Sequence, residues 1–146
     1  MLSDNLEEYL EVIWVLEVDE KNGSVKTGDI AERLNVAPSS VNEMLNKLTE
    51  LGYLHYRKYY GVSLTEEGKT KARNIVRRHR LAERLLVDIL NIPKENIERV
   101  ACGFEHSINA EVEEEICKLL KHPALCPHGN SIPAGKCCTR EEPQNI

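Results

Sequence analysis

The sequence predicts a mainly α-helical protein in which a winged helix-turn-helix domain is followed by an all-helical domain. Two short helical patterns are joined by the connection "NVA", and an alternating, tyrosine-rich segment, "YLHYRKYYGVSL", comes next. After that segment the helical period returns and continues to about residue 122. The order helix, turn, helix, hairpin is typical of the winged arrangement.

The first half of the chain supplies the elements of the winged domain. Apolar residues repeat at helical spacing over residues 4–18. Thr27 is expected to cap a short second helix, and Pro38 suits the first turn of a third helix over 38–52 that ends at Gly52. The tyrosine-rich segment predicts two short strands around a turn near 58–61.

The second half predicts only helices and a tail. Thr65 begins a long helix that reaches about residue 91, Pro93 opens another, and 109–120 is the last, after a break near Ser107. The expected domains are therefore 1–72 (winged helix), 73–122 (helical) and 123–146, a tail rich in Cys, Pro and Gly that we expect to be loop.

The charge is unevenly distributed along the chain. The net charge is −5, yet residues 44–80 carry nine Lys/Arg against three Glu (+6), so the remainder carries −11. A basic segment in an acidic protein indicates a face for an anionic polymer, although a solvated helix face gives the same pattern. Because there is no signal peptide or transmembrane run and the five cysteines are odd in number, we expect a cytoplasmic protein with no membrane partner.

A polar surface on the third helix and the hairpin is the candidate DNA interface. Side chains there are small, polar or basic, as contacts to base edges and phosphates require. A helical hairpin with an ordinary polar surface is the alternative. The candidate residues are Thr27, Ala37, Pro38, Ser39, Ser40, Asn42, Glu43, Asn46 and Lys47, with Arg57, Lys58, Tyr59 and Tyr60 in the wing.

The segment "ACGFEHSINAEVEEEI" predicts half of a metal site. Cys102, Glu105 and His106 stand at i, i+3 and i+4 on one helix face, and Glu98 lies four residues before Cys102. In the long helix, His79 and Glu83 form an i, i+4 pair, which alone is more often a salt bridge. A thiol, carboxylates and imidazoles together indicate a transition-metal centre.

The tail "CPHGNSIPAGKCC" holds a second set of ligand types. Cys126, His128, Cys137 and Cys138 are candidates for a tail metal site, but their spacing is not that of a zinc ribbon, and free intracellular thiols are the alternative. Cys117 falls in a helical apolar pattern and is expected in the core or at a dimer interface. The sequence offers no partner for His122.

Four segments together resemble the diphtheria-toxin-repressor family of iron- and manganese-dependent regulators. They are "EEYLEVIWVLE", "IAERLNVAPSSVNEMLNKLTELGYL", "LTEEGKTKARNIVRRHRLAERLL" and "ACGFEHSINAEVEEEI". The resemblance implies a homodimer that binds a palindromic, double-stranded operator when loaded with divalent metal, through a winged-helix domain and a helical dimerisation domain. It also implies a short form, without the SH3-like C-terminal domain of some members.

The resemblance also assigns ligands. His79, Glu83 and Glu98 correspond to one metal position, and Cys102, Glu105 and His106 to a second, with Glu8 from the first helix. Glu11 matches a further ligand of the manganese branch; solvated helix residues are the alternative for Glu8 and Glu11. The Cys102 thiolate favours Fe(II), with Mn(II) second, and Zn, Co or Ni are expected to substitute because the affinity order favours them.

The expected function is therefore a metal-dependent repressor, not an enzyme, with the metal as co-repressor of metal-homeostasis genes. Two alternatives remain at this point. One is a small metallohydrolase that uses the same ligand cluster, and the other is a metal-independent winged-helix protein whose ligand-like residues are salt bridges.

Overall fold

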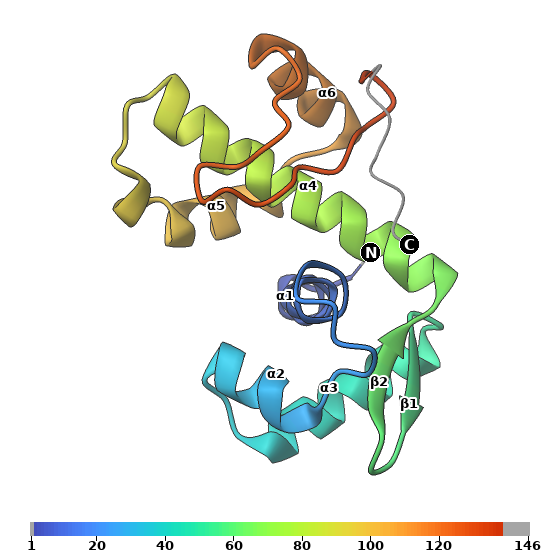
Figure 1. The fold of residues 1–146 in the computed structure, drawn as a ribbon. Coiled ribbons are helices and arrows are strands. Elements are labelled where there is room, and N and C mark those ends of the chain that lie inside the picture. Colours follow the sequence, from blue (N-terminus) through green and yellow to red (C-terminus); the bar gives the residue numbers. More distant parts are fainter. Residues whose placement is uncertain (1, 139–146) are drawn as a thin grey trace. The chain divides into compact units, whose positions relative to one another are not determined.

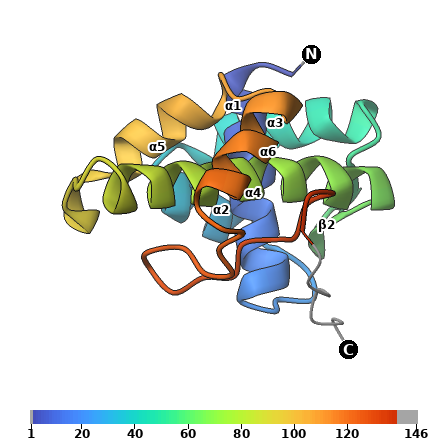
Figure 2. The same ribbon diagram turned by 90° about the horizontal axis from the view of Figure 1, so that it is seen from above.

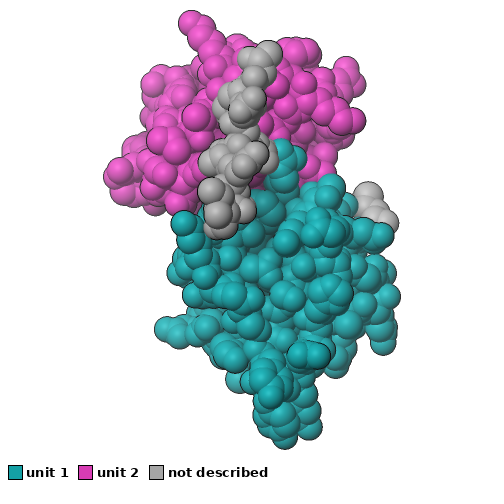
Figure 3. All heavy atoms as spheres, turned by 45° about the vertical axis from the view of Figure 1, so that its right-hand side comes forward, with its two compact units in different colours: residues 1–73 teal, residues 74–146 magenta. Residues whose placement is uncertain are grey.

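The computed structural model describes residues 2–138 and divides the chain into two compact units, Met1–Arg73 and Asn74–Ile146 (Figures 1 and 3). Its described part is mostly helical, with a single two-stranded antiparallel sheet, which confirms the predicted mainly α fold. Within 2–138, no helix has both the length and the apolar character that crossing a bilayer demands. The expected domain limits 1–72, 73–122 and 123–146 stay a prediction.

The first unit holds the helix-turn-helix and its wing. Ser3 caps the first helix, because its side chain accepts a hydrogen bond from the N–H of Leu6 at 3.3 Å. Thr27 is the first residue of the second helix and not its cap, since the Lys26 carbonyl already accepts from Ile30 N–H at 3.2 Å. In chain order the elements are α1 (Asp4–Trp14), a π-helix (Val15–Asp19), α2 (Thr27–Leu34), α3 (Pro38–Glu50), β1 (Leu54–Arg57) and β2 (Gly61–Leu64).

The turn between α2 and α3 has a local cause. Asn35 ends α2 in the left-handed region (φ 54°), which asparagine adopts more readily than most residues. Pro38 then occupies the first turn of α3, where its missing N–H costs no hydrogen bond. The three helices bury one apolar face each; the fully buried residues are Leu10, Ile13, Ile30, Val41, Leu45 and Leu48.

The wing is an antiparallel hairpin with a firm register. Leu54 pairs with Leu64 and Arg57 with Gly61, so Leu54 and Leu64 both point into the core. Val25 joins the edge of the sheet through two backbone hydrogen bonds to Val62, each 2.8 Å long. The two hydrogen bonds tie the wing to the segment that precedes α2.

The second unit is built on the long helix α4 (Glu66–Asp88), which starts in the first unit. Thr65 caps α4 by accepting from the N–H of Gly68 at 3.0 Å, and Asn109 caps α6 by accepting from Val112 at 2.9 Å. The other elements are a 3₁₀ turn (Lys94–Asn96), α5 (Glu98–Glu105) and α6 (Ala110–Leu119). Their shared core comprises Leu81, Ala82, Leu86, Ile97, Ala101, Ile108, Ile116, Cys117, Cys126 and Ile132.

The chain after α6 has no helix or strand up to residue 138, apart from an isolated bridge between Leu125 and Ser131. It nevertheless runs back along α4 (Figures 1 and 2). Arginines of α4 hold it by donating to its carbonyls: Arg77 to Pro133 at 2.9 Å, Arg80 to Ser131 at 2.6 Å and Arg84 to Leu125 at 2.8 Å.

Candidate functional site

The predicted DNA interface is open to solvent in the first unit. Thr27 is half-buried at the start of α2. The remaining candidates on α3 and in the wing are all exposed: Ala37, Pro38, Ser39, Ser40, Asn42, Glu43, Asn46, Lys47, Arg57, Lys58, Tyr59 and Tyr60. Since α3 buries only Val41, Leu45 and Leu48, its polar side is available to a partner.

The wing tip carries aromatic and basic side chains that the fold does not need. Tyr59 is 87% exposed and Tyr60 67%, and the Lys58 ammonium lies 5.4 Å from the centre of the Tyr59 ring. Tyr56 links wing and helix by donating a long hydrogen bond (3.5 Å) to Asn42 Oδ1. An exposed tip of this composition suits contact with a sugar-phosphate backbone.

A cluster of acids and imidazoles lies in the second unit, where α4 supplies His79 and Glu83. His79 Nε2 is 3.0 Å from Glu83 Oε1 and 3.7 Å from Glu98 Oε1 on α5. His79 is 6% and Glu83 3% exposed, whereas Glu98 is exposed. The three residues that the family resemblance assigned to one metal position therefore lie close together.

Glu105 forms the other half of this cluster and is 2% exposed. Its Oε2 is 3.0 Å from His79 Nδ1 and its Oε1 is 3.5 Å from His106 Nε2. Neither Glu105 oxygen accepts a hydrogen bond from the residues that the structure describes. Cys102 Sγ and a ring nitrogen of His106 lie within 4.8 Å of each other. Cys102 and Glu105 lie on α5, and His106 is the residue that ends it. That the three bind one metal stays a prediction.

This donor set fits a divalent transition metal. A buried carboxylate without hydrogen bonds is strongly disfavoured unless a positive charge balances it. Burial opposes ionisation of Glu83, but its contacts with His79 and His128 outweigh burial and lower the pKa of that carboxyl. Ionised carboxylates and imidazole nitrogens are ligands that Fe(II), Mn(II) and Zn(II) accept, and a thiolate favours the softer of these metals.

The two remaining predicted ligands lie in the first unit. Glu8 and Glu11 stand on α1, and both side chains are half-buried. Their role as ligands stays a prediction from the family resemblance.

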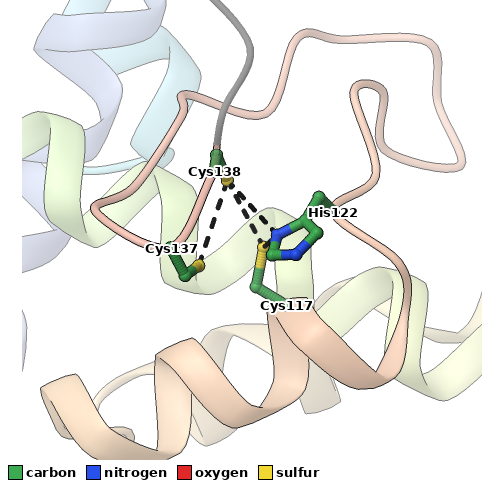
Figure 4. Close-up of side chains that lie close together, drawn as sticks. All are labelled: Cys117, His122, Cys137 and Cys138. Carbon is green, nitrogen blue, oxygen red and sulfur yellow. Dashed lines mark hydrogen bonds between the residues drawn. The ribbon is translucent and has the colours of Figure 1, made fainter.

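The tail ligands do not form one group among residues 2–138. Cys126 and His128 approach Glu83 instead, with His128 Nδ1 2.6 Å from Glu83 Oε2. Cys137 and Cys138 approach Cys117 and His122 (Figure 4). Cys117 was expected in the core or at a dimer interface, and it lies fully buried in the core of the second unit. No partner was predicted for His122, although the spacing Cys-x₄-His across the end of α6 was an available signal.

The thiols of this second group differ in acidity. Burial raises the pKa of Cys117 to about 11. Burial also disfavours the thiolate of Cys138, but hydrogen bonds from Gly135, His122 and Cys117 outweigh it and lower the pKa of Cys138 to about 6.

Two family models match consecutive parts of the chain. Residues 1–62 match the N-terminal DNA-binding domain of iron-dependent repressors, and residues 65–134 match the metal-binding and dimerisation domain of the same proteins. Together they include α1–α6, β1, the first half of β2 and the first half of the tail, up to residue 134.

Individual relatives agree with the family models. An uncharacterised HTH-type transcriptional regulator of Methanocaldococcus jannaschii is 36% identical over 115 residues, which are 79% of this chain and 91% of that protein. The iron-dependent repressor IdeR of Mycobacterium tuberculosis is 37% identical over 132 residues, covering 90% of this chain and 56% of the repressor. The chain thus spans about half the length of that repressor.

A solved structure gives the same result for the fold. A manganese-dependent transcriptional repressor in complex with manganese has a TM-score of 0.82 and 32% identity, covering 94% of this chain and 63% of that one. Iron-dependent and manganese-dependent regulators are therefore both among the similar proteins.

Proposed function

Because the chain belongs to the iron-dependent repressor family, we propose that it is a transcriptional repressor that binds operator DNA when it holds a divalent metal. The observation that carries the proposal is the buried carboxylate of Glu105, which faces His79 and His106 and accepts no hydrogen bond from residues 2–138. If Glu105 served only to stabilise the fold, its buried carboxylate would normally accept hydrogen bonds. Their absence among residues 2–138 therefore favours a metal ligand over a structural salt bridge.

The proposed metal ligands are His79, Glu83 and Glu98 at one position, and Cys102, Glu105 and His106 at the other. When bound, the metal supplies the positive charge that balances these carboxylates and the thiolate. Without that charge, Glu83 on α4 and Glu105 on α5 repel each other in a buried setting, which loosens the packing of α5 on α4. Because of these carboxylates, the second unit should be fully ordered only when a cation is bound.

We favour Fe(II) as the physiological co-repressor, with Mn(II) second. The Cys102 thiol is the reason, since a thiolate ligand selects iron, cobalt, nickel or zinc over manganese. Glu83, Glu98 and Glu105 supply hard oxygen ligands that still tolerate Mn(II). Zn, Co and Ni are expected to activate the protein in vitro. The regulated genes would then be those of metal homeostasis.

On the DNA side, α3 would enter the major groove with Ser39, Ser40 and Asn42 towards base edges. The wing residues Arg57 and Lys58 would neutralise phosphates, so binding should weaken steeply with salt. This arrangement uses the exposed side of α3 and leaves its buried side in the core.

A homodimer would explain apolar side chains on the surface of the second unit. Val100 (55% exposed) and Phe104 (38%) lie one turn apart on α5, and Val112 on α6 is 41% exposed. Exposed apolar side chains that share a helix face indicate a protein partner. A second copy of the chain would give the two-fold symmetry that a palindromic, double-stranded operator requires.

The test is fluorescence anisotropy with DNA from upstream of the chain's own gene, under anaerobic conditions. Fe(II), Mn(II) and Zn(II) are titrated separately against a chelated sample. Wild type should bind only with metal, and Glu105→Gln should lose this response while Glu95→Gln, an exposed control on the 3₁₀ turn, keeps it. Equal binding with and without metal would instead support a metal-independent winged-helix protein.

A further inference from the structure

The second unit holds a group of three thiols and one imidazole that the family's metal positions do not include. Cys117 comes from α6, His122 from just beyond its end, and Cys137 and Cys138 from the tail (Figure 4). Cys117 Sγ is 3.3 Å from His122 Nδ1 and 3.6 Å from Cys138 Sγ. Cys138 Sγ is 3.7 Å from His122 Nδ1 and 4.0 Å from Cys137 Sγ.

The end of α6 brings the first two of these side chains together. The N–H of His122 donates to the carbonyl of Cys117 at 2.8 Å, and the N–H of Lys121 donates to that of Lys118 at 3.0 Å. This pair of hydrogen bonds is the Schellman motif, which folds the chain back over the last helical turn. Lys121 and His122 both have positive φ (62° and 54°), a conformation that non-glycine residues seldom adopt in succession.

The tail delivers the other two side chains in a fixed position. The arginines of α4 hold its backbone at Leu125, Ser131 and Pro133. Gly135 lies so close to Arg77 that a Cβ there would be 2.5 Å from the guanidinium. A turn closed by the Cys138 N–H to Gly135 carbonyl hydrogen bond (3.0 Å) then carries both cysteines.

Four of the six distances between the ligand atoms match those of a tetrahedral metal site. Thiolates at about 2.3 Å and an imidazole nitrogen at about 2.0 Å from a tetrahedral zinc stand about 3.8 Å (S to S) and about 3.5 Å (S to N) apart. The S–S separations of 3.6 and 4.0 Å and the S–N separations of 3.3 and 3.7 Å each fall within about 0.2 Å of those values. All four ligand atoms lie within 4.8 Å of one another.

We propose that Cys117, His122, Cys137 and Cys138 form a closed Cys₃His site for a structural Zn²⁺, distinct from the metal positions on α4 and α5. Four protein ligands complete the coordination of zinc and leave no position for a substrate or water, as in structural zinc sites. Soft thiolates select zinc against manganese, so the site would not compete for Mn(II). Its role would be to fasten the tail to the end of α6.

The surroundings of the site balance its charge. Three thiolates and Zn²⁺ sum to −1, and Arg77, which is 1% exposed, places Nη2 3.5 Å from Cys137 Sγ. The same guanidinium donates to Pro133 and lies 3.7 Å from Glu113 through Nε. A buried arginine that contacts a ligand sulfur is the kind of outer partner that metal sites require.

The experiment uses the full chain, purified under reducing, anaerobic conditions, in a Cys102→Ser background. This background removes the thiolate of the other metal centre, so that Cys126, which lies near Glu83 and His128, is the one cysteine left outside the proposed zinc site. Zinc is counted by mass spectrometry of the native protein, and Co(II) is then exchanged in. We expect one tightly held zinc and, with Co(II), a strong thiolate charge-transfer band with the intense visible bands of a tetrahedral site.

Cys138→Ser and Cys126→Ser are the paired variants, because both change a tail cysteine by one atom and only Cys138 belongs to the cluster. Cys138→Ser should lose the bound zinc, or at least a third of the charge-transfer intensity of the Co(II) form. Cys126→Ser should keep the zinc and the full intensity. Glu105→Gln should also keep both, which separates this site from the proposed co-repressor centre. Three results would overturn the proposal: no bound zinc, an equal loss in Cys126→Ser, or a disulfide within the cluster in the protein as purified.

Discussion

Replacing Gly135 by alanine tests how the tail is fastened to α4. The added Cβ would lie 2.5–2.6 Å from Nη2, Cζ and Nε of Arg77, whereas ordinary contacts begin near 3.4 Å. The guanidinium must therefore move by about 1 Å. Since Arg77 is 1% exposed, it has no solvent to move into, and its 2.9 Å hydrogen bond to the Pro133 carbonyl should break.

The size of the effect follows from that hydrogen bond. Loss of a buried hydrogen bond to a charged group costs about 1.5–3 kcal/mol. Replacing glycine by alanine recovers about 0.4–1 kcal/mol by restricting the unfolded chain, because Gly135 does not have a positive φ. The free energy of unfolding of the second unit should therefore fall by about 0.5–2.6 kcal/mol, which lowers the urea midpoint by about 1 M.

The assay is urea unfolding of reduced protein, at one fixed concentration of divalent metal for wild type and variant, followed by far-UV circular dichroism. Fluorescence of Trp14, the single tryptophan, follows the first unit in the same samples. Gly103→Ala is the control, because Gly103 lies in α5 with no atom within 4 Å of the place that an added Cβ would occupy, and alanine should raise stability there. If Gly135→Ala is as stable as wild type or more so, Arg77 does not hold the tail in the way described.

Three further changes test the first unit. Burial raises the pKa of Glu17, so the charged carboxylate destabilises the folded protein above that pKa. Glu17→Gln should therefore raise the Tm at neutral pH, and the gain should shrink as the pH falls through the pKa of Glu17. An unchanged Tm would contradict this reasoning. Lys58→Ala should reduce the log–log slope of DNA binding against salt by about 0.9 for each Lys58, about 1.8 for the proposed dimer, and an unchanged slope would remove Lys58 from the interface. Gly61→Ala should lower the Tm, because the φ of Gly61 is 103° and an added Cβ would clash with the Val25 carbonyl. Gly23→Ala is the control and should leave the Tm unchanged, because no atom lies within 4 Å of the place that its Cβ would occupy.

Local signals made much of the fold predictable from the sequence. Thr65 and Pro38 mark the starts of α4 and α3 because caps and first-turn prolines act through neighbouring residues. The wing was readable from its alternation and its turn residues. The spacing of Cys102, Glu105 and His106 placed them on one helix face because helical geometry is set by three or four residues.

The tail was not predictable in the same way. Its order depends on arginines of α4 that lie 41–56 residues away in the sequence, and long-range pairing of this kind leaves no local pattern. Where the chain turns back after α6, Lys121 and His122 adopt the left-handed backbone conformation. Glycine or asparagine is the usual residue in that conformation after a helix, so the turn was not recognisable from the sequence. The pairing of Glu83 with His128, which are distant in the sequence, therefore appeared only in three dimensions.

The central claim, that metal and operator DNA stabilise the same state, is tested most directly by their reciprocity. Calorimetry would measure the affinity for Fe(II), and for Mn(II), with and without saturating operator DNA, in protein whose tail thiols are already loaded with Zn²⁺. DNA should tighten metal binding by the same factor by which metal tightens DNA binding. A metal affinity that is unchanged by DNA would contradict it.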